Sequence, residues 1–217
     1  MTYQTAVFDL DGTLLNTLED LTDAVLYIQK KFDFPLHNIE LVRQHVGNGI
    51  RKLIIRSIPD GEDNPRFEEV YQEFLDYYQK NCQVKTRAYD GIMELLKELH
   101  ESNIKMAIVS NKAHGAVDEL NEIYFKDYIK VAIGENEAAG IKKKPAPDSV
   151  FHALKLLGSK KEEAVYVGDS EVDRATAENA GMDCVLCSWG FRERELLEGL
   201  KPIAIIDEPK DLLKIIK

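Results

Sequence analysis

Short apolar runs alternate with helical stretches along most of this chain, and that order constrains the fold more than any other feature. Runs typical of buried strands occupy residues 104–109, 164–167 and 184–187, with weaker ones at 128–133 and 203–206. Between and after them, apolar residues with helical spacing occupy residues 90–100, a stretch from about 113, 147–157, 174–180 and 211–216. Alternating strands and helices predict an α/β fold, a parallel sheet with helices on both faces.

Residues from about 15 to 85 interrupt this order, because they show helical patterns and no strand pattern. A helix is expected to begin at Thr17, where Thr17 and Asp20 resemble a capping box, and further helices are expected at 50–58 and 66–79. We therefore predict two domains: an α/β core formed by residues 1–14 and 86–217, and a helical insertion at 15–85. Ligands of open parallel sheets bind beyond the carboxyl ends of the strands, where this insertion would emerge and could cover the site.

The overall charge and hydropathy exclude some classes of partner. The chain of 217 residues carries a net charge of −10, which argues against sequence-independent binding to nucleic acid or anionic membranes. No apolar stretch reaches the roughly 18 residues that span a bilayer, and the first residues lack the features of a signal peptide. We expect a cytoplasmic protein, either a monomer or a weak homodimer, with no nucleic-acid or membrane partner.

Two aspartates directly follow the first apolar run, Ala6-Val7-Phe8, in the segment Asp9-Leu10-Asp11-Gly12-Thr13. Side chains two residues apart at a strand end reach one site only if the chain turns there, and Gly12 permits such a turn. One carboxylate could then attack an electrophile while the other transfers a proton. A plain strand-to-loop junction is the alternative, so the chemical interpretation needs partners elsewhere in the sequence.

Polar residues suited to phosphate and metal chemistry follow the other predicted strands. These are Ser110 and Asn111 after 104–109, Asp169 and Asp173 after 164–167, and Lys142, Lys143 and Lys144 before the helix at 147–157. Three carboxylates meeting at one sheet edge would repel one another, and a divalent cation relieves that repulsion. Oxygen ligands favour Mg²⁺, while a hydroxyl, backbone N–H groups and one lysine suit a phosphoryl group.

In order and spacing, these four motifs resemble those of the haloacid dehalogenase superfamily of phosphohydrolases over nearly the whole chain. The resemblance implies a Rossmann-like parallel sheet, the haloacid dehalogenase-like fold, with an inserted α-helical cap domain. It also implies roles for single residues. Asp9 would be the nucleophile that forms an aspartyl-phosphate, Asp11 the general acid and base, Ser110 and Asn111 phosphoryl ligands, and Lys144 the balancing charge. Mg²⁺ would be held by Asp9, the backbone carbonyl of Asp11 and Asp169, with Asp173 as a further ligand or as an acceptor behind the ligands.

Within the family, Asp11 argues against dehalogenation, which needs no proton donor for the leaving group. The segment from His45 to Arg51 is similar to the substrate loop of phosphoglycolate phosphatases, so Gly47, Asn48 and Gly49 are candidate substrate-binding residues, although a simple helix-start turn explains them equally well. We predict a Mg²⁺-dependent phosphatase acting on a small phosphorylated metabolite, with phosphoglycolate as a candidate.

Alternatives remain open at this point. A β-phosphoglucomutase-like phosphoryl transferase is disfavoured because Gly168-Asp169 stands where mutases resemble Glu-Asp. A pyrophosphatase or a broad sugar-phosphate phosphatase is a further alternative, because the caps of this family are permissive. A protein of a different class, a non-catalytic phosphate-binding regulatory module, is disfavoured because each expected catalytic position holds the residue type that catalysis needs.

Overall fold

The computed structural model describes residues 3–216 and divides the chain into two compact units. One unit comprises Met1–Leu14 with Ala88–Lys217, and the other comprises Leu15–Arg87. A capping role for the second unit stays a prediction.

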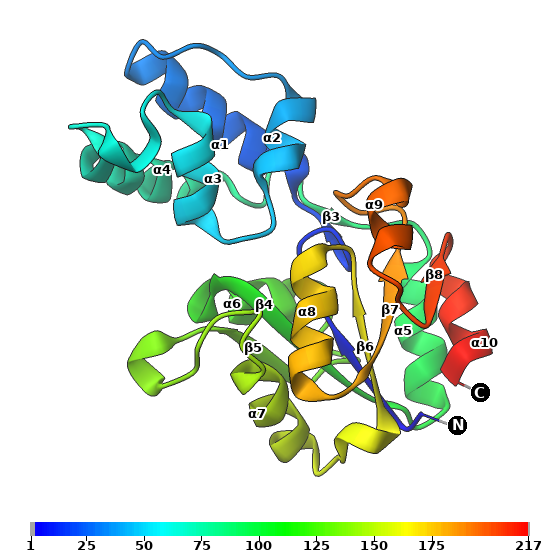
Figure 1. The fold of residues 1–217 in the computed structure, drawn as a ribbon. Helices are drawn as coiled ribbons and strands as arrows, with labels where there is room; N and C mark the ends of the chain where they lie inside the picture. The colour runs from blue at the N-terminus through cyan, green and yellow to red at the C-terminus, as the bar shows by residue number, and fades with distance from the viewer. Residues whose placement is uncertain (1–2, 217) are drawn as a thin grey trace. The chain divides into compact units, whose positions relative to one another are not determined.

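The first unit is built on a six-stranded sheet in the order β5-β4-β1-β6-β7-β8, with every neighbouring pair parallel (Figure 1). Its strands are β1 (Thr5–Phe8), β4 (Lys105–Ala113), β5 (Val131–Glu135), β6 (Ala164–Gly168), β7 (Asp183–Cys187) and β8 (Ala204–Ile206). From β1 the chain builds the sheet outward through β4 and β5, then returns to the other side of β1 with β6. The carboxyl ends of β4, β1 and β6 therefore flank the point where the strand order reverses, which is where ligands bind in such sheets.

Helices connect these strands and cover the sheet. They are α5 (Ile92–Glu101), α6 (His114–Tyr124), α7 (Asp148–Leu157), α8 (Glu171–Ala180), α9 (Arg194–Gly199) and α10 (Leu213–Ile216), with 3₁₀ turns η2 (Glu137–Ala139), η3 (Lys161–Glu163) and η4 (Pro209–Leu212). Val7, Val109 and Leu186 face a core that includes Val150 and Leu154 of α7 and Ala177 of α8. The residues that alternate with them along the strands, such as Phe8, Ile108, Val167 and Val185, are buried as well. Both faces of the sheet are covered, and the predicted α/β fold is confirmed.

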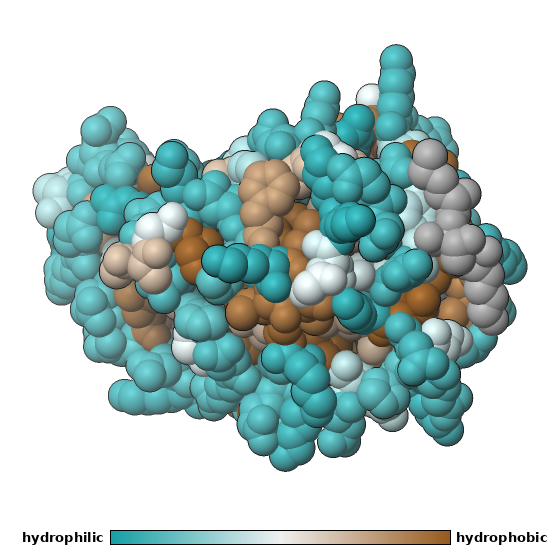
Figure 2. Space-filling model, turned by 90° about the horizontal axis from the view of Figure 1, so that it is seen from below, coloured by the Kyte–Doolittle hydropathy of each residue, from teal (hydrophilic) through white to brown (hydrophobic). Residues whose placement is uncertain are grey.

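The surface is largely hydrophilic, in keeping with the chain's 30% charged residues. Figure 2 shows one face on which hydrophilic side chains predominate and hydrophobic ones are visible between them. Among the described residues, no helix is long and apolar enough to cross a membrane.

The second unit is helical, with α1 (Leu18–Lys31), α2 (Ile39–His45), α3 (Ile50–Ser57), η1 (Gly61–Asp63) and α4 (Phe67–Asn81). β2 (Leu15–Asn16) and β3 (Arg87–Ala88) form a separate two-stranded sheet, which the sequence analysis did not predict. The apolar stripe of α4 is core, since Phe67, Val70, Phe74 and Tyr78 are all buried.

The predicted capping box at the start of α1 is wrong. Thr17 is the N-cap residue, but its side chain accepts no capping hydrogen bond. The Asp20 carboxylate instead accepts hydrogen bonds from the backbone N–H groups of Lys85 and Thr86 and from the Thr86 hydroxyl. Asp20 is buried, and a buried carboxylate needs hydrogen-bond donors, which residues 85 and 86 supply here.

Two element boundaries near the strand ends also differ from the prediction. β4 continues through the polar residues 110–112 to Ala113, and its pairing with β5 shifts register there, so Ser110 and Asn111 lie within the strand and not after it. α8 begins at Glu171, three residues earlier than expected, because Ser170 and Asp173 form a capping box there. The short helices α2 and α9 were not predicted.

Candidate active site

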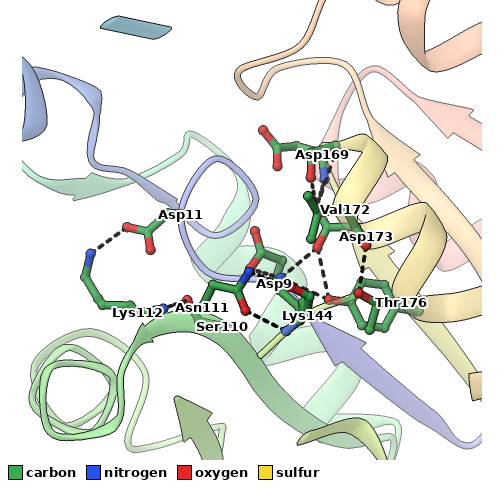
Figure 3. Close-up of polar contacts among 12 residues, drawn as sticks. Asp9, Asp11, Ser110, Asn111, Lys112, Lys144, Asp169, Val172, Asp173 and Thr176 are labelled. Carbon is green, nitrogen blue, oxygen red and sulfur yellow. Dashed lines mark hydrogen bonds and ion pairs between the residues drawn. The ribbon is translucent and has the colours of Figure 1, made fainter. Parts of the chain in front are cut away.

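Three neighbouring strands bring Asp9, Ser110 and Asp169 together at their carboxyl ends (Figure 3). β1 pairs with β4 on one side and β6 on the other, so Asp9 follows β1 between Ser110 of β4 and Asp169 after β6. The backbone N–H of Asp9 donates to the carbonyl of Val167 at 2.9 Å, which continues the sheet ladder into the site. Asp9, Ser110 and Asp169 are all buried.

The turn after Asp11 depends on Gly12. Its φ of +94° is unfavourable for any side chain, and a Cβ at this position would lie 2.4 Å from Asp169 Oδ2. Glycine is therefore required both by the backbone and by the space that Asp169 occupies. The turn predicted at Gly12 is therefore present, whereas the joint action of Asp9 and Asp11 at one site stays a prediction.

The Lys144 ammonium group is the centre of the polar network. Its Nζ lies 2.6 Å from Asp9 Oδ1, 2.8 Å from Asp173 Oδ1 and 3.2 Å from the Tyr166 hydroxyl. The lysine side chain is only 4% exposed. Burial alone would lower the pKa of Lys144, but the charges of Asp173 and Asp9 outweigh it and raise that pKa well above its usual value. The two carboxylates therefore favour the charged form of Lys144 beside Asp9.

Asn111 fixes the backbone that carries Lys144. Its Oδ1 accepts from the Lys144 N–H at 2.7 Å, and its Nδ2 donates to the Lys144 carbonyl at 3.1 Å. Both ends of the Asn111 amide are thus used to hold Lys144 in place. The predicted contact between Asn111 and the phosphoryl group stays a prediction.

The carboxylate of Asp173 is fully engaged in hydrogen bonds. It accepts five hydrogen bonds, from Lys144, Tyr166, the Asp169 N–H, and the N–H and hydroxyl of Ser170. Lys144 and these hydrogen bonds lower the pKa of Asp173 despite the opposing effect of burial. This arrangement favours the role of an acceptor behind the ligands, which orients Lys144 and the loop after β6.

Two members of the network were missed by the sequence analysis. Tyr166 is a fully buried tyrosine in the otherwise apolar β6, and its hydroxyl hydrogen-bonds to Asp173. A tyrosine within a buried strand is a signal that could have found it, since a buried hydroxyl needs a partner. Lys112 is also buried, and its Nζ lies 3.0 Å from Asp11 Oδ1.

Asp9, Asp169 and Asp173 form a cluster that could hold a metal ion. One carboxylate oxygen from each lies within 4.8 Å of the others, and all three residues are buried. Burial, followed by the charge of Asp173, raises the pKa of Asp9 to about 7, and the same two causes raise that of Asp169. Asp169 Oδ2 accepts from the Phe191 N–H at 2.7 Å. The Asp11 carboxylate is not part of this cluster. Metal binding by the backbone carbonyl of Asp11 stays a prediction.

The candidate substrate loop lies in the other unit. Gly47, Asn48 and Gly49 precede α3, with φ values of +117° at Gly47 and +83° at Gly49. Asn48 Oδ1 accepts from Arg56 Nη2 at 2.7 Å, which ties the loop to the last turn of α3. Substrate binding by these three residues stays a prediction.

Comparison with known proteins identifies what the chain is similar to. The family model described as haloacid dehalogenase-like hydrolase matches residues 6–187. Phosphoglycolate phosphatase 1 of Pseudomonas aeruginosa is 32% identical over 212 residues, which cover 95% of this chain and 77% of the relative. Phosphoglycolate phosphatase of Aquifex aeolicus is 30% identical over 210 residues, covering 96% and 94%. The crystal structure of a candidate phosphoglycolate phosphatase from Lactobacillus delbrueckii subsp. bulgaricus superposes with a TM-score of 0.93, at 33% identity, over 100% of this chain and 99% of the other.

Replacing Tyr166 by phenylalanine tests the network around Lys144. The ring is kept, but Asp173 and Lys144 lose a hydroxyl partner inside a buried site. We expect the free energy of unfolding, measured by urea denaturation, to fall by about 1–3 kcal/mol, the cost of removing one partner of a buried hydrogen bond.

Tyr3→Phe is the matched control, because it removes a single hydrogen bond to the exposed Asp183. Its expected cost is about 1 kcal/mol or less. A loss in Tyr166→Phe no larger than that in Tyr3→Phe would contradict the central place of this network.

Proposed function

Because the chain belongs to the haloacid dehalogenase-like hydrolases and is a phosphatase, we propose that it hydrolyses a small phosphate monoester through an aspartyl-phosphate on Asp9, with Mg²⁺ bound. The observation that supports this most is the buried Asp9 carboxylate, which lies at the end of β1 between the Lys144 cation and Asp169. A nucleophilic carboxylate needs a nearby positive charge to accept a dianionic phosphate, and this site supplies one.

In the first step, an oxygen of Asp9 attacks phosphorus and forms the new P–O bond. The bond from phosphorus to the ester oxygen breaks, its electron pair goes to that oxygen, and Asp11 supplies the proton that makes it an alcohol. In the second step, water attacks the same phosphorus, Asp11 takes its proton, and Asp9 leaves as a free carboxylate. One residue can serve both steps because donating its proton in the first makes it the base for the second.

Other residues of the chain bind and orient the phosphoryl group. The Ser110 hydroxyl and the Lys144 ammonium are the donors at the carboxyl ends of the strands, and Asn111 and Asp173 keep Lys144 in place. Asp9 and Asp169, with the backbone carbonyl of Asp11, would hold Mg²⁺. When bound, the metal would neutralise charge on the phosphoryl oxygens and on the clustered carboxylates.

Phosphoglycolate is the first candidate substrate, because it is the substrate named for the relatives from Pseudomonas aeruginosa and Aquifex aeolicus. The N–H groups at the start of α3, after Gly-Asn-Gly, suit its carboxylate. Gly168 favours hydrolysis over mutase chemistry, because mutases resemble Glu-Asp at this point of the sequence. A Cβ at Gly168 would lie 2.3 Å from the Cβ of Asp173, so no glutamate fits there.

A panel of phosphate esters, including 2-phosphoglycolate, pyrophosphate, hexose phosphates and p-nitrophenyl phosphate, tests the proposed function. With Mg²⁺ we expect turnover of at least one monoester, and Asp9→Asn should lower kcat/KM at least about 10³-fold, as loss of a covalent nucleophile does elsewhere. Asp118→Asn, at an exposed position of α6, is the control and should keep full activity. Activity that survives in Asp9→Asn would rule out the aspartyl-phosphate.

Stabilisation by Mg²⁺ should depend on pH. Since the pKa of Asp9 is raised to about 7, its carboxyl holds a proton at lower pH that the metal must displace. A carboxyl whose pKa is higher in the folded than in the unfolded state stabilises the folded state fully at a pH below its unfolded pKa. That stabilisation is lost as the pH rises toward 7, so the metal-free protein has a lower free energy of unfolding in the pH range where Mg²⁺ binds best.

We therefore expect a fixed excess of Mg²⁺ to raise Tm more at about pH 8 than at about pH 5.5, in calorimetry or dye-based melting. Asp169→Asn should reduce the shift at both pH values, whereas Asp118→Asn should not. An equal or larger shift at the lower pH would argue against metal binding at this carboxylate cluster.

A further inference from the structure

Lys112 forms a second lysine–aspartate pair beside the first, in which the lysine is buried and the aspartate is partly buried. Its Nζ lies 3.0 Å from Asp11 Oδ1, with side-chain exposures of 5% for the lysine and 18% for the aspartate. The two aspartates of the first motif therefore each contact their own lysine, Asp9 with Lys144 and Asp11 with Lys112. Exposed ion pairs contribute little, but removing one member of a buried pair leaves a charge that has lost its partner.

The extension of β4 delivers Lys112 to this place. Ser110 and Lys112 both lie in this last part of β4, and both residues are buried. The Lys112 N–H also donates to Ser110 Oγ at 3.1 Å. Figure 3 shows Lys112 reaching Asp11 on one side of Asp9, with Asp169 and Asp173 drawn on the other. One strand thus supplies both a phosphoryl-binding hydroxyl and a cation for Asp11.

We propose that Lys112 is a positioning residue that holds Asp11 through Oδ1 and leaves Oδ2 to carry the proton. This inference rests on the proposed phosphatase reaction. Asp11 lies beside the Gly12 turn, and its carboxylate can rotate about two side-chain bonds unless it is held. Proton transfer requires the donor oxygen within hydrogen-bond reach of the ester oxygen, so a fixed carboxylate lowers the barrier.

The proton balance is that of the proposed reaction. The proton on Asp11 Oδ2 passes to the ester oxygen as the bond from phosphorus to that oxygen breaks and the bond from Asp9 to phosphorus forms. Lys112 keeps its own proton throughout both steps. It touches neither phosphorus nor the leaving group in this scheme, and it acts only through Asp11.

The choice of leaving group in the substrate distinguishes a positioning role for Lys112 from the other roles that a buried lysine can have. The value of kcat/KM covers the steps up to ester cleavage. An alkyl phosphate needs its leaving oxygen protonated in that step, whereas p-nitrophenolate leaves well without a proton. A positioning role for Lys112 therefore predicts a loss concentrated on alkyl esters. A lysine that binds the phosphoryl group, or that only supports the fold, would affect both kinds of ester alike.

The test compares Lys112→Met with the wild type on 2-phosphoglycolate, glycerol phosphate and p-nitrophenyl phosphate, with Mg²⁺ present. We expect kcat/KM for the alkyl esters to fall at least about 10-fold more than for p-nitrophenyl phosphate, a part of the roughly 10²–10⁴-fold that a general acid contributes. Lys112→Arg, which keeps the charge, should restore most of the alkyl activity. Lys105→Met, an exposed lysine at the other end of β4, is the control and should show no preference among esters.

A double variant completes the test. If Lys112 acts only through Asp11, adding Lys112→Met to Asp11→Asn should cause no further loss on alkyl esters. Equal losses on all three esters, full activity of Lys112→Met on alkyl esters, or additive losses in the double variant would each overturn the proposal. A wild type without activity on any ester would instead overturn the proposed function, and this inference with it. Should Lys112→Met fail to fold, the activities of Lys112→Arg and Asp11→Asn on the same three esters test whether Lys112 acts through Asp11.

Discussion

The contact on which the rest of the site depends is the buried ammonium of Lys144 between Asp9 and Asp173. Nζ lies 2.6 Å from one carboxylate and 2.8 Å from the other, with almost no exposure to water. Removing one partner from such a group typically costs about 3–5 kcal/mol, because a charge is left buried without compensation. Tyr166, Asn111 and the start of α8 all serve this one cation, and the parallel sheet brings them to it.

The single positive charge of Lys144 does not balance the negative charges of the aspartates clustered at this site. Lys144 contacts the carboxylates of Asp9 and Asp173, and Asp169 lies close to both of these aspartates. Burial and the charge of Asp173 raise the pKa values of Asp9 and Asp169. A site in this condition gains by binding a divalent cation through oxygen ligands, and it gains again by holding a phosphoryl group between that cation, Lys144 and Ser110. The proposed Mg²⁺-dependent chemistry follows from this balance of charges.

Much of the arrangement could be predicted from the sequence, because strand order places every strand's carboxyl end at one edge. The parallel fold, the family and the phosphatase class are confirmed. The partners of single side chains were harder to predict, since Lys112 and Asp11 are 101 positions apart and neither sequence neighbourhood indicates the other. The capping box at Thr17 failed for the same reason, because the donors to Asp20 come from residues 85 and 86. Polar residues at 110–112 concealed the end of β4, since backbone pairing with β5 continues to Ala113, beyond the last hydrophobic residue of the predicted strand.

The central claim is that the phosphoryl group is transferred to Asp9. Rapid acid quench of the Mg²⁺-loaded enzyme during turnover of a ³²P-labelled monoester, followed by peptide mapping, tests it directly. The account predicts label on the peptide that contains Asp9, released by hydroxylamine and absent from Asp9→Asn. Label on a different residue, or turnover in the wild type without any labelled protein under conditions that slow the second step, would contradict it.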